Sequence, residues 1–318
     1  MKNNLAPIVL FVYNRPWHTK QTIEALQKNE LARDSELFIY SDAPKNKKVE
    51  KQVKEVRNYI KTISGFKKVT IIERDKNYGL AKNIIEGVTE IVNKYGKIIV
   101  LEDDLITSPY FLRFMNEALN FYENEEKVMH ISGYMYPINN EGLNDVFFIK
   151  PTSCWGWATW KRAWKFFKKD VDFYLKVFTK KIIKDFNLNN SYDYFSQIVD
   201  NKKGKIDTWA IFWYASVYLR GGLSLHPKES FVKNIGFDGT GAYCGKSDVF
   251  NVELKSDFDI KFTTKIEEDL EARKRLEEFF RKIRPPFYKR ISIKILKSIG
   301  LYEVAKQIYR KQKRKSEK

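Results

Sequence analysis

Three consecutive acids, Glu102, Asp103 and Asp104, follow the apolar run at residues 98–101 and could bind a metal ion. A short β-branched run predicts a buried strand. Carboxylates at its end converge on one point, and their repulsion favours a bound cation. Hard oxygen ligands suit Mg²⁺ or Mn²⁺, which bind one or two carboxylates while substrate phosphates complete the coordination. The triplet therefore predicts a metal site for a nucleoside diphosphate; a solvated turn, or a cap for a helix near Ser108, is the alternative.

Strands and helices alternate along the first hundred residues. Apolar runs predict strands at residues 7–12, 36–40, 68–73 and 98–102, and helical spacing predicts helices at 19–26, 51–63 and 79–92. This order predicts an α/β fold, a mainly parallel sheet flanked by helices. Ligands of such sheets bind beyond the carboxyl ends of the strands.

Candidate polar residues stand after each predicted strand: Tyr13, Asn14 and Arg15, then Asp42, then Asp75 and Asn77, then the acidic triplet. Separate loops thus point to one crevice. A G-x-x-x-x-G-K-S/T loop is missing and no G-x-G-x-x-G follows the first strand, which counts against P-loop enzymes and dinucleotide dehydrogenases. We expect metal and side chains to hold the phosphates.

An aromatic region follows residue 130. We expect a helix starting at Gly156, with Trp157, Trp160 and Trp164 on one face. Packing on the sheet is one explanation for these indoles. Sugar stacking is the other, above all for Trp155 at the turn.

An isolated acid, Asp207, precedes a predicted apolar helix at residues 211–219. It is either a helix N-cap or part of a site. The three histidines are scattered and expected to be structural, with a metal or phosphate contact left open for His226. Cys154 and Cys244 are expected to be reduced thiols, because two distant cysteines form neither a disulfide framework nor a zinc motif.

The net charge of +18 is concentrated at the end of the chain. Residues 281–318 hold 14 lysines and arginines against two glutamates, leaving +6 for the rest. After Pro285 and Pro286, apolar residues recur every fourth position among basic ones, which predicts a basic amphipathic helix. This helix could have one of three roles: its apolar face could dock on the rest of the protein, or the helix could bind nucleic acid or attach to anionic lipid. We favour the membrane surface among these and expect no nucleic-acid partner.

No apolar run approaches the roughly 18 residues needed to span a bilayer, and the first residues lack the pattern of a signal peptide. We therefore expect a cytoplasmic protein, peripheral on the inner face of the cell membrane.

Residues 5–245 resemble the GT-A fold of nucleotide-sugar glycosyltransferases, and within it the N-acetylglucosaminyltransferase I family and bacterial family-two enzymes. The segments that carry this resemblance are Val100-Leu101-Glu102-Asp103-Asp104 with Ser108-Pro109-Tyr110-Phe111, Asn14-Arg15-Pro16, Ser41-Asp42, Asn77-Tyr78-Gly79-Leu80 with Asn83, Gly156-Trp157 and Asp207-Thr208-Trp209.

The resemblance implies a role for each candidate residue. Asp104 would bind Mn²⁺ or Mg²⁺, Asp103 would contact the donor ribose or sugar, and Arg15 and Asp42 would flank the base. The other donor-binding residues would be Tyr13, Asn14, Asn77, Gly79, Lys82, Gly236 and Asp238, the last two within a segment at 233–241 that closes over the donor. Trp155 and Trp157 would bind the acceptor. Asp207 would be the catalytic base, although Lys-Ile-Asp-Thr-Trp stands where the family has a doubled acid before Trp.

These roles predict a metal-dependent inverting glycosyltransferase that moves a hexosyl or N-acetylhexosaminyl group from a nucleoside-diphosphate sugar, UDP-sugar favoured, to a glycan or lipid-linked saccharide in cell-envelope polysaccharide synthesis. Residues 1–130 would form the nucleotide-sugar half, 131–262 the acceptor half of the same domain, and 263–318 the basic tail. A sugar-phosphate nucleotidyltransferase is the alternative, although the glycine-rich loop it needs is missing between Val12 and Thr22. A non-catalytic scaffold of the same fold at the membrane is another.

Overall fold

A computed structural model describes residues 5–240 and 247–284 of the chain. The chain forms two compact units, Met1–Phe279 and Phe280–Lys318. The first unit carries every element described here, apart from the last residues of one helix. The predicted helices of the basic tail, after Pro286, lie outside the described residues.

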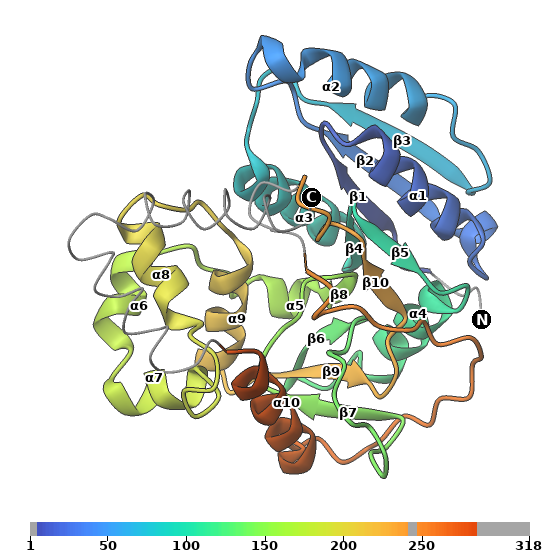
Figure 1. Cartoon of the computed structure of the whole chain (residues 1–318). Helices are drawn as coiled ribbons and strands as arrows, with labels where there is room; N and C mark the ends of the chain where they lie inside the picture. The colour runs from blue at the N-terminus through green and yellow to red at the C-terminus, as the bar shows by residue number, and fades with distance from the viewer. Residues whose placement is uncertain (1–4, 241–246, 285–318) are drawn as a thin grey trace, which may run out of the picture. The chain divides into compact units, whose positions relative to one another are not determined.

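The elements alternate as the sequence predicts up to β4 (Figure 1). The strands are β1 (Ile8–Val12), β2 (Glu36–Ser41), β3 (Lys68–Glu73), β4 (Lys97–Glu102), β5 (Leu105–Thr107), β6 (Val128–Ser132), β7 (Val146–Ile149), β8 (Trp157–Trp160), β9 (Leu223–Pro227) and β10 (Val232–Asn234). The helices are α1 (Pro16–Gln27), η1 (Ala32–Asp34), α2 (Lys47–Ile60), α3 (Leu80–Tyr95), α4 (Phe111–Phe121), α5 (Lys161–Trp164), α6 (Val171–Val177), α7 (Lys180–Phe186), α8 (Phe195–Lys202), α9 (Ala210–Leu219) and α10 (Leu270–Ile283).

Eight strands form one sheet in the order β3-β2-β1-β4-β8-β6-β9-β7. The first four are parallel to one another, as are β6 and β9, whereas β8 and β7 run antiparallel to their neighbours. Strand β5 pairs with β10 in a small second sheet. The boundary predicted near residue 130 falls inside β6, so one sheet spans both predicted halves.

Two apolar layers cover the sheet. Residues of α1, α2 and α4 pack on one face, and residues of α3, α5 and α9 pack on the other. Alternate residues of β4 face the two layers: Ile99 and Leu101 join the first, and Ile98 and Val100 the second. Such burial on both faces explains the continuous apolar sequence of this strand.

The helix predicted at Gly156 and Trp157 is wrong, because residues 157–160 form β8. Gly156 has φ of 64°, a conformation that glycine adopts readily, and the chain then pairs with β4 and β6. In a strand, side chains alternate between faces. Trp157 therefore packs in the α3–α9 layer and Trp160 in the α1–α4 layer.

An irregular segment, residues 247–269, runs across the body before α10. Hydroxyl groups of three body residues hold its carbonyls: Ser108 Oγ donates to Lys255 O at 2.6 Å, Tyr134 Oη to Phe250 O at 2.9 Å and Tyr122 Oη to Thr263 O at 2.9 Å. The start of α10 is fixed by ionic contacts that we call the α7–α10 ion network: Lys150, Asp185, Tyr218, Glu268 and Arg273.

No helix among the described residues has the length and apolar character that crossing a bilayer requires.

Candidate active site at the carboxyl edge of β4

The turn after β1 lies against the acids that follow β4, because these two strands are hydrogen-bonded neighbours. Asp103 Oδ2 accepts a hydrogen bond from Tyr13 N at 3.3 Å. Asp104 Oδ2 accepts one from Arg15 Nη1 at 2.8 Å. The structure thus brings together four residues that the sequence assigned to one site. The alternative helix cap is not observed, because α4 has Tyr110 as its N-cap.

The segment after β10 covers this acidic pair. Ile235 N donates to Asp104 O at 2.8 Å, and a Cβ at position 236 would overlap with Asp104 Oδ2. Only glycine allows the backbone to approach the carboxylate so closely. Two residues further on, Asp238 Oδ1 lies 3.9 Å from Arg15 Nη2 and Asp238 Oδ2 lies 3.0 Å from His18 Nε2.

His18 is therefore a contact of the site that the sequence reasoning missed. The sequence does hold a signal for this role: His18 follows Arg15 by three residues, which places both side chains at the start of α1. Burial, together with the positive charge of Arg15, lowers the pKa of His18, while Asp238 and Asp104 act in the opposite direction.

The acidic triplet does not act as three equivalent charges. Burial and then the charges of Asp104 and Asp103 raise the pKa of Glu102 to about 8. Burial and the charge of Asp104 also raise the pKa of Asp103, although Arg15 opposes this rise. Only the last two acids lie within ion-pair distance of Arg15.

Asp42 holds a neighbouring loop. Its carboxylate, buried in the structure, accepts hydrogen bonds from Ala43 N at 2.9 Å, Tyr78 N at 2.8 Å, Gly79 N at 2.9 Å and Asn77 Nδ2 at 3.1 Å. The loop between β3 and α3 is thereby fixed to the end of β2. Both oxygens of Asp42 are used inside the protein, so its predicted contact with a base would need these bonds to rearrange.

The remaining predicted donor residues lie at the same edge of the sheet. Asn14 stands in the turn after β1 and is partly exposed. Tyr13 Oη accepts a hydrogen bond from Lys45 N at 3.0 Å, which ties this turn to the loop after β2. On α3, Lys82 Nζ lies 4.7 Å from the centre of the Tyr78 ring and 3.6 Å from Glu86 Oε1.

The two predicted acceptor-binding tryptophans differ in exposure. Trp157 is fully buried, and its ring stacks on Trp209 and His130 with centroid distances of 5.2 and 5.4 Å. The expected acceptor contact of Trp157 is therefore corrected to a packing role, because a sugar cannot reach an enclosed ring. Trp155 is partly buried, and its ring lies 5.4 Å from that of Phe237 in the segment after β10.

Asp207 stands in the loop before α9, outside the Arg15 cluster. Its side chain is 67% exposed and forms an ion pair with Lys169. It does not cap the helix, whose N-cap is Trp209. Trp209 stacks on Trp157, and Trp157 lies opposite Val100 in the sheet. Trp209, two residues after Asp207, thus packs in the same apolar layer as Val100 of β4.

The donor set at β4 fits a hard divalent cation that takes most of its ligands from a substrate. Asp104 offers a carboxylate, and Gly236 keeps a side chain away from it. Within residues 5–240 and 247–284, no group of three or more His, Cys, Asp or Glu side chains is arranged to hold a metal ion. Phosphate oxygens would have to complete the coordination.

The ring of His226 is engaged by groups inside the protein, in keeping with the structural role expected of it. It is fully buried in β9, where its ring nitrogens lie 3.1 Å from Pro151 O and 3.2 Å from Tyr134 O.

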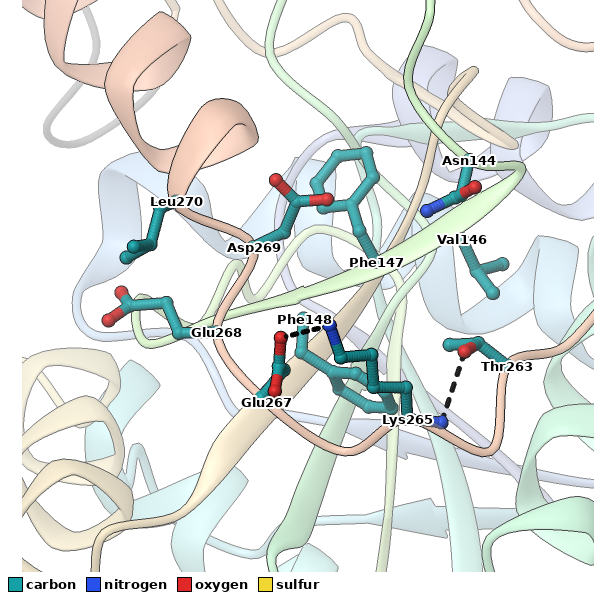
Figure 2. Close-up of a pocket in the computed structure, with 10 residues that line it drawn as sticks. All are labelled: Asn144, Val146, Phe147, Phe148, Thr263, Lys265, Glu267, Glu268, Asp269 and Leu270. Atoms are coloured by element: carbon teal, nitrogen blue, oxygen red, sulfur yellow. Dashed lines mark hydrogen bonds and ion pairs between the residues drawn. The ribbon is translucent and has the colours of Figure 1, made fainter.

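A pocket also lies between β7 and residues 263–270 (Figure 2). Its lining contains none of the predicted site residues. At its rim, Lys265 Nζ pairs with Glu267 Oε1 at 2.6 Å and Lys265 N donates to Thr263 Oγ1 at 3.1 Å. Because none of the predicted site residues lines it, this pocket is not the candidate site.

Known proteins resemble the chain at low identity. An uncharacterized glycosyltransferase of Methanocaldococcus jannaschii is 28% identical over 143 residues, which are 45% of each chain, so this chain spans less than half of that relative. S. aureus TarS 1-349 matches with a TM-score of 0.41 and 9% identity, over 71% of this chain and 59% of that one. The mannosyltransferase PcManGT of Pyrobaculum calidifontis, solved with GDP-Man and Mn²⁺, matches with a TM-score of 0.38 and 10% identity, over 68% and 69%.

The family is established by a longer match. The model of glycosyl transferase family 2 matches residues 8–180, more than half of the chain. The match and the mainly parallel sheet flanked by helices confirm the predicted GT-A fold, whereas the narrower likeness to N-acetylglucosaminyltransferase I stays a prediction. The residues that hold the acidic pair, from Tyr13 to Asp104, fall inside the matched range. The chain belongs to glycosyl transferase family 2.

Proposed function

We propose that the chain is a metal-dependent, inverting glycosyltransferase that uses a nucleoside-diphosphate sugar, with UDP-sugar favoured. The observation that carries the proposal is the pair Asp103 and Asp104 at the end of β4, with the backbone of Gly236 against the second carboxylate. In a family-two chain, such a pair suits a divalent metal and a diphosphate. Both the hexosyl or N-acetylhexosaminyl group and the Mn²⁺ or Mg²⁺ belong to this proposal.

Asp104 would hold the metal, and Asp103, beside Tyr13 N, would orient the donor. When bound, the metal would offset the negative charge that develops on the leaving diphosphate. The loop that Asp42 fixes presents Asn77 and Gly79 at the same edge, where they would contact the nucleotide. Residues 235–240 would cover the donor and exclude water from it.

Asp207 would accept the proton of an acceptor hydroxyl. As that oxygen bonds to the anomeric carbon, the bond from this carbon to the diphosphate oxygen breaks, and the diphosphate carries away the electron pair. Attack from the face opposite the diphosphate inverts the anomeric centre. Lys169 must release Asp207 before the carboxylate can act, and Trp155 would contact the incoming saccharide.

The first test is thermal stabilisation and hydrolysis with UDP-, GDP-, CMP- and dTDP-sugars, with and without Mn²⁺. We expect one donor to stabilise the wild type only with metal, and Asp104→Asn to lose this response. Asp34→Asn is the matched control, because this exposed acid lies before β2 at the opposite end of the sheet. A response that Asp104→Asn retains would refute the metal position.

The second test separates binding from chemistry. We expect Asp207→Asn to bind the selected donor like the wild type and to lose transfer by about 100-fold or more, the usual contribution of a general base. The anomeric configuration of the product, read by NMR, must be opposite to that of the donor. A product with the donor's configuration would contradict the inverting mechanism.

The acceptor and location are proposed from the basic tail, residues 281–318. A lipid-linked saccharide of cell-envelope synthesis would be reached from an anionic membrane surface, where each basic residue contributes about 1 kcal/mol. The full chain should pellet with anionic vesicles at low salt, and a chain ending at residue 280 should not. Equal pelleting of both would show that the tail is not the anchor.

A further inference from the structure

Arg15 places one positive charge among three carboxylates. Its Nη1 donates to Asp104 Oδ2 at 2.8 Å and lies 3.9 Å from Asp103 Oδ1, and its Nη2 lies 3.9 Å from Asp238 Oδ1. The arginine side chain is only 15% exposed. Charges this close interact strongly in a partly buried site. Arg15 therefore offsets part of the negative charge of the acidic pair in this structure.

The same guanidinium has donors left over. Within the part of the chain that the structure describes, the buried Nε and Nη2 atoms of Arg15 have no hydrogen-bond partner. A buried N–H group without an acceptor costs free energy. The planar guanidinium suits bidentate binding of phosphate oxygens. Arg15 thus binds Asp104 through Nη1, while its Nε and Nη2 donors stay without a hydrogen-bond acceptor among the described residues.

We propose that Arg15 is an internal counter-ion that competes with the divalent metal for Asp104. The inference deepens the proposed function and rests on it. Asp104 Oδ2 already accepts the hydrogen bond from Nη1, so a metal on this oxygen must displace the guanidinium or lie beside it. Two cations at one carboxylate repel each other. Arg15 therefore keeps the affinity for free metal low, and it acts on metal binding as a positioning residue.

The test is the affinity for Mn²⁺ alone, read from the electron paramagnetic resonance signal of free Mn²⁺ without nucleotide. We expect Arg15→Gln to bind Mn²⁺ at least about tenfold tighter than the wild type, a typical coupling between two sites. Arg15→Lys keeps the charge, so its affinity should stay near that of the wild type. Arg33→Gln removes one exposed arginine before β2 and controls for net charge.

Asp104→Asn separates the inference from the proposed function. We expect this variant to lose Mn²⁺ binding. If it binds Mn²⁺ like the wild type, the metal position fails and the inference fails with it. If Asp104→Asn loses the metal while Arg15→Gln binds it equally or more weakly, Arg15 orients the carboxylate instead of competing for it, and the inference alone is overturned. Thermal unfolding of each variant confirms that it is folded.

Discussion

We predict that His130 makes the folded protein less stable in mild acid. The residue is fully buried in β6, and its Nδ1 accepts a hydrogen bond from Trp213 Nε1 at 3.0 Å. Its Nε2 lies 2.9 Å from Ser153 O, so the proton of the neutral ring belongs on Nε2. If Nδ1 were protonated, its N–H group would face the N–H group of Trp213 Nε1, and neither could accept a hydrogen bond from the other. Burial, and then the charge of His226, lower the pKa of His130 to about 3.

The sign and size of the effect follow from this pKa. The unfolded chain takes up a proton near pH 6.5, and the folded chain does so only near pH 3. The stabilisation is therefore present above pH 6.5 and is lost as the pH falls toward 3. Each pH unit in this window is worth about 1.4 kcal/mol. Lowering the pH from 7 to 5 should thus cost about 2 kcal/mol through His130, or about 3 °C in Tm for a chain of this length.

His130→Gln isolates this contribution. An amide offers an acceptor to Trp213 and a donor to Ser153 but does not titrate in this range. Urea unfolding at pH 7 and pH 5 should show a loss of stability about 2 kcal/mol larger in the wild type than in the variant, because all other titrating groups are shared. The same loss in both proteins would refute the assigned tautomer and its buried, neutral state.

Three further changes test the site and its support. Asp42→Asn sets an amide against backbone N–H donors, so it should cost about 2 kcal/mol and speed hydrogen exchange at Tyr78. Gly236→Ala places a methyl group against Asp104, so calorimetry should show at least about tenfold weaker donor binding with little change in Tm. Burial alone would raise the pKa of Asp185, but hydrogen bonds within the α7–α10 ion network lower it to about 2. The ionised Asp185 should therefore add roughly 1–2 kcal/mol to the free energy of unfolding, after allowance for solvent screening. In acid unfolding this contribution should be lost between pH 4 and pH 2, and Asp185→Asn should lack it.

The parallel half of the fold could be predicted because its signals are local. The runs at β1 and β4 are short, apolar and rich in β-branched residues, and each ends in polar residues. Parallel strands present their carboxyl ends at one edge, so Tyr13, Arg15 and Asp104 could be placed together before their contacts were known.

The aromatic region could not be predicted in the same way. The spacing of Trp157 and Trp160 fits both a helical stripe and a strand with the two rings on opposite faces. Gly156 decides between them through its positive φ, and the pairing with β4 and β6 stabilises the strand. Both are properties of the tertiary structure. The contact between His18 and Asp238, more than 200 residues apart, depends likewise on how β10 pairs with β5.

The structure also changes the reason for expecting a metal. Three adjacent carboxylates would demand a cation if all three were ionised and faced one point. Glu102 instead shares the face of Val100, and its pKa of about 8 keeps it largely protonated at pH 7. Burial and the charge of Asp104 raise the pKa of Asp103 as well, and Arg15 pairs with Asp104. Charge repulsion alone therefore does not require a metal at this edge, and the proposed metal must gain its affinity from the phosphates that bind with it.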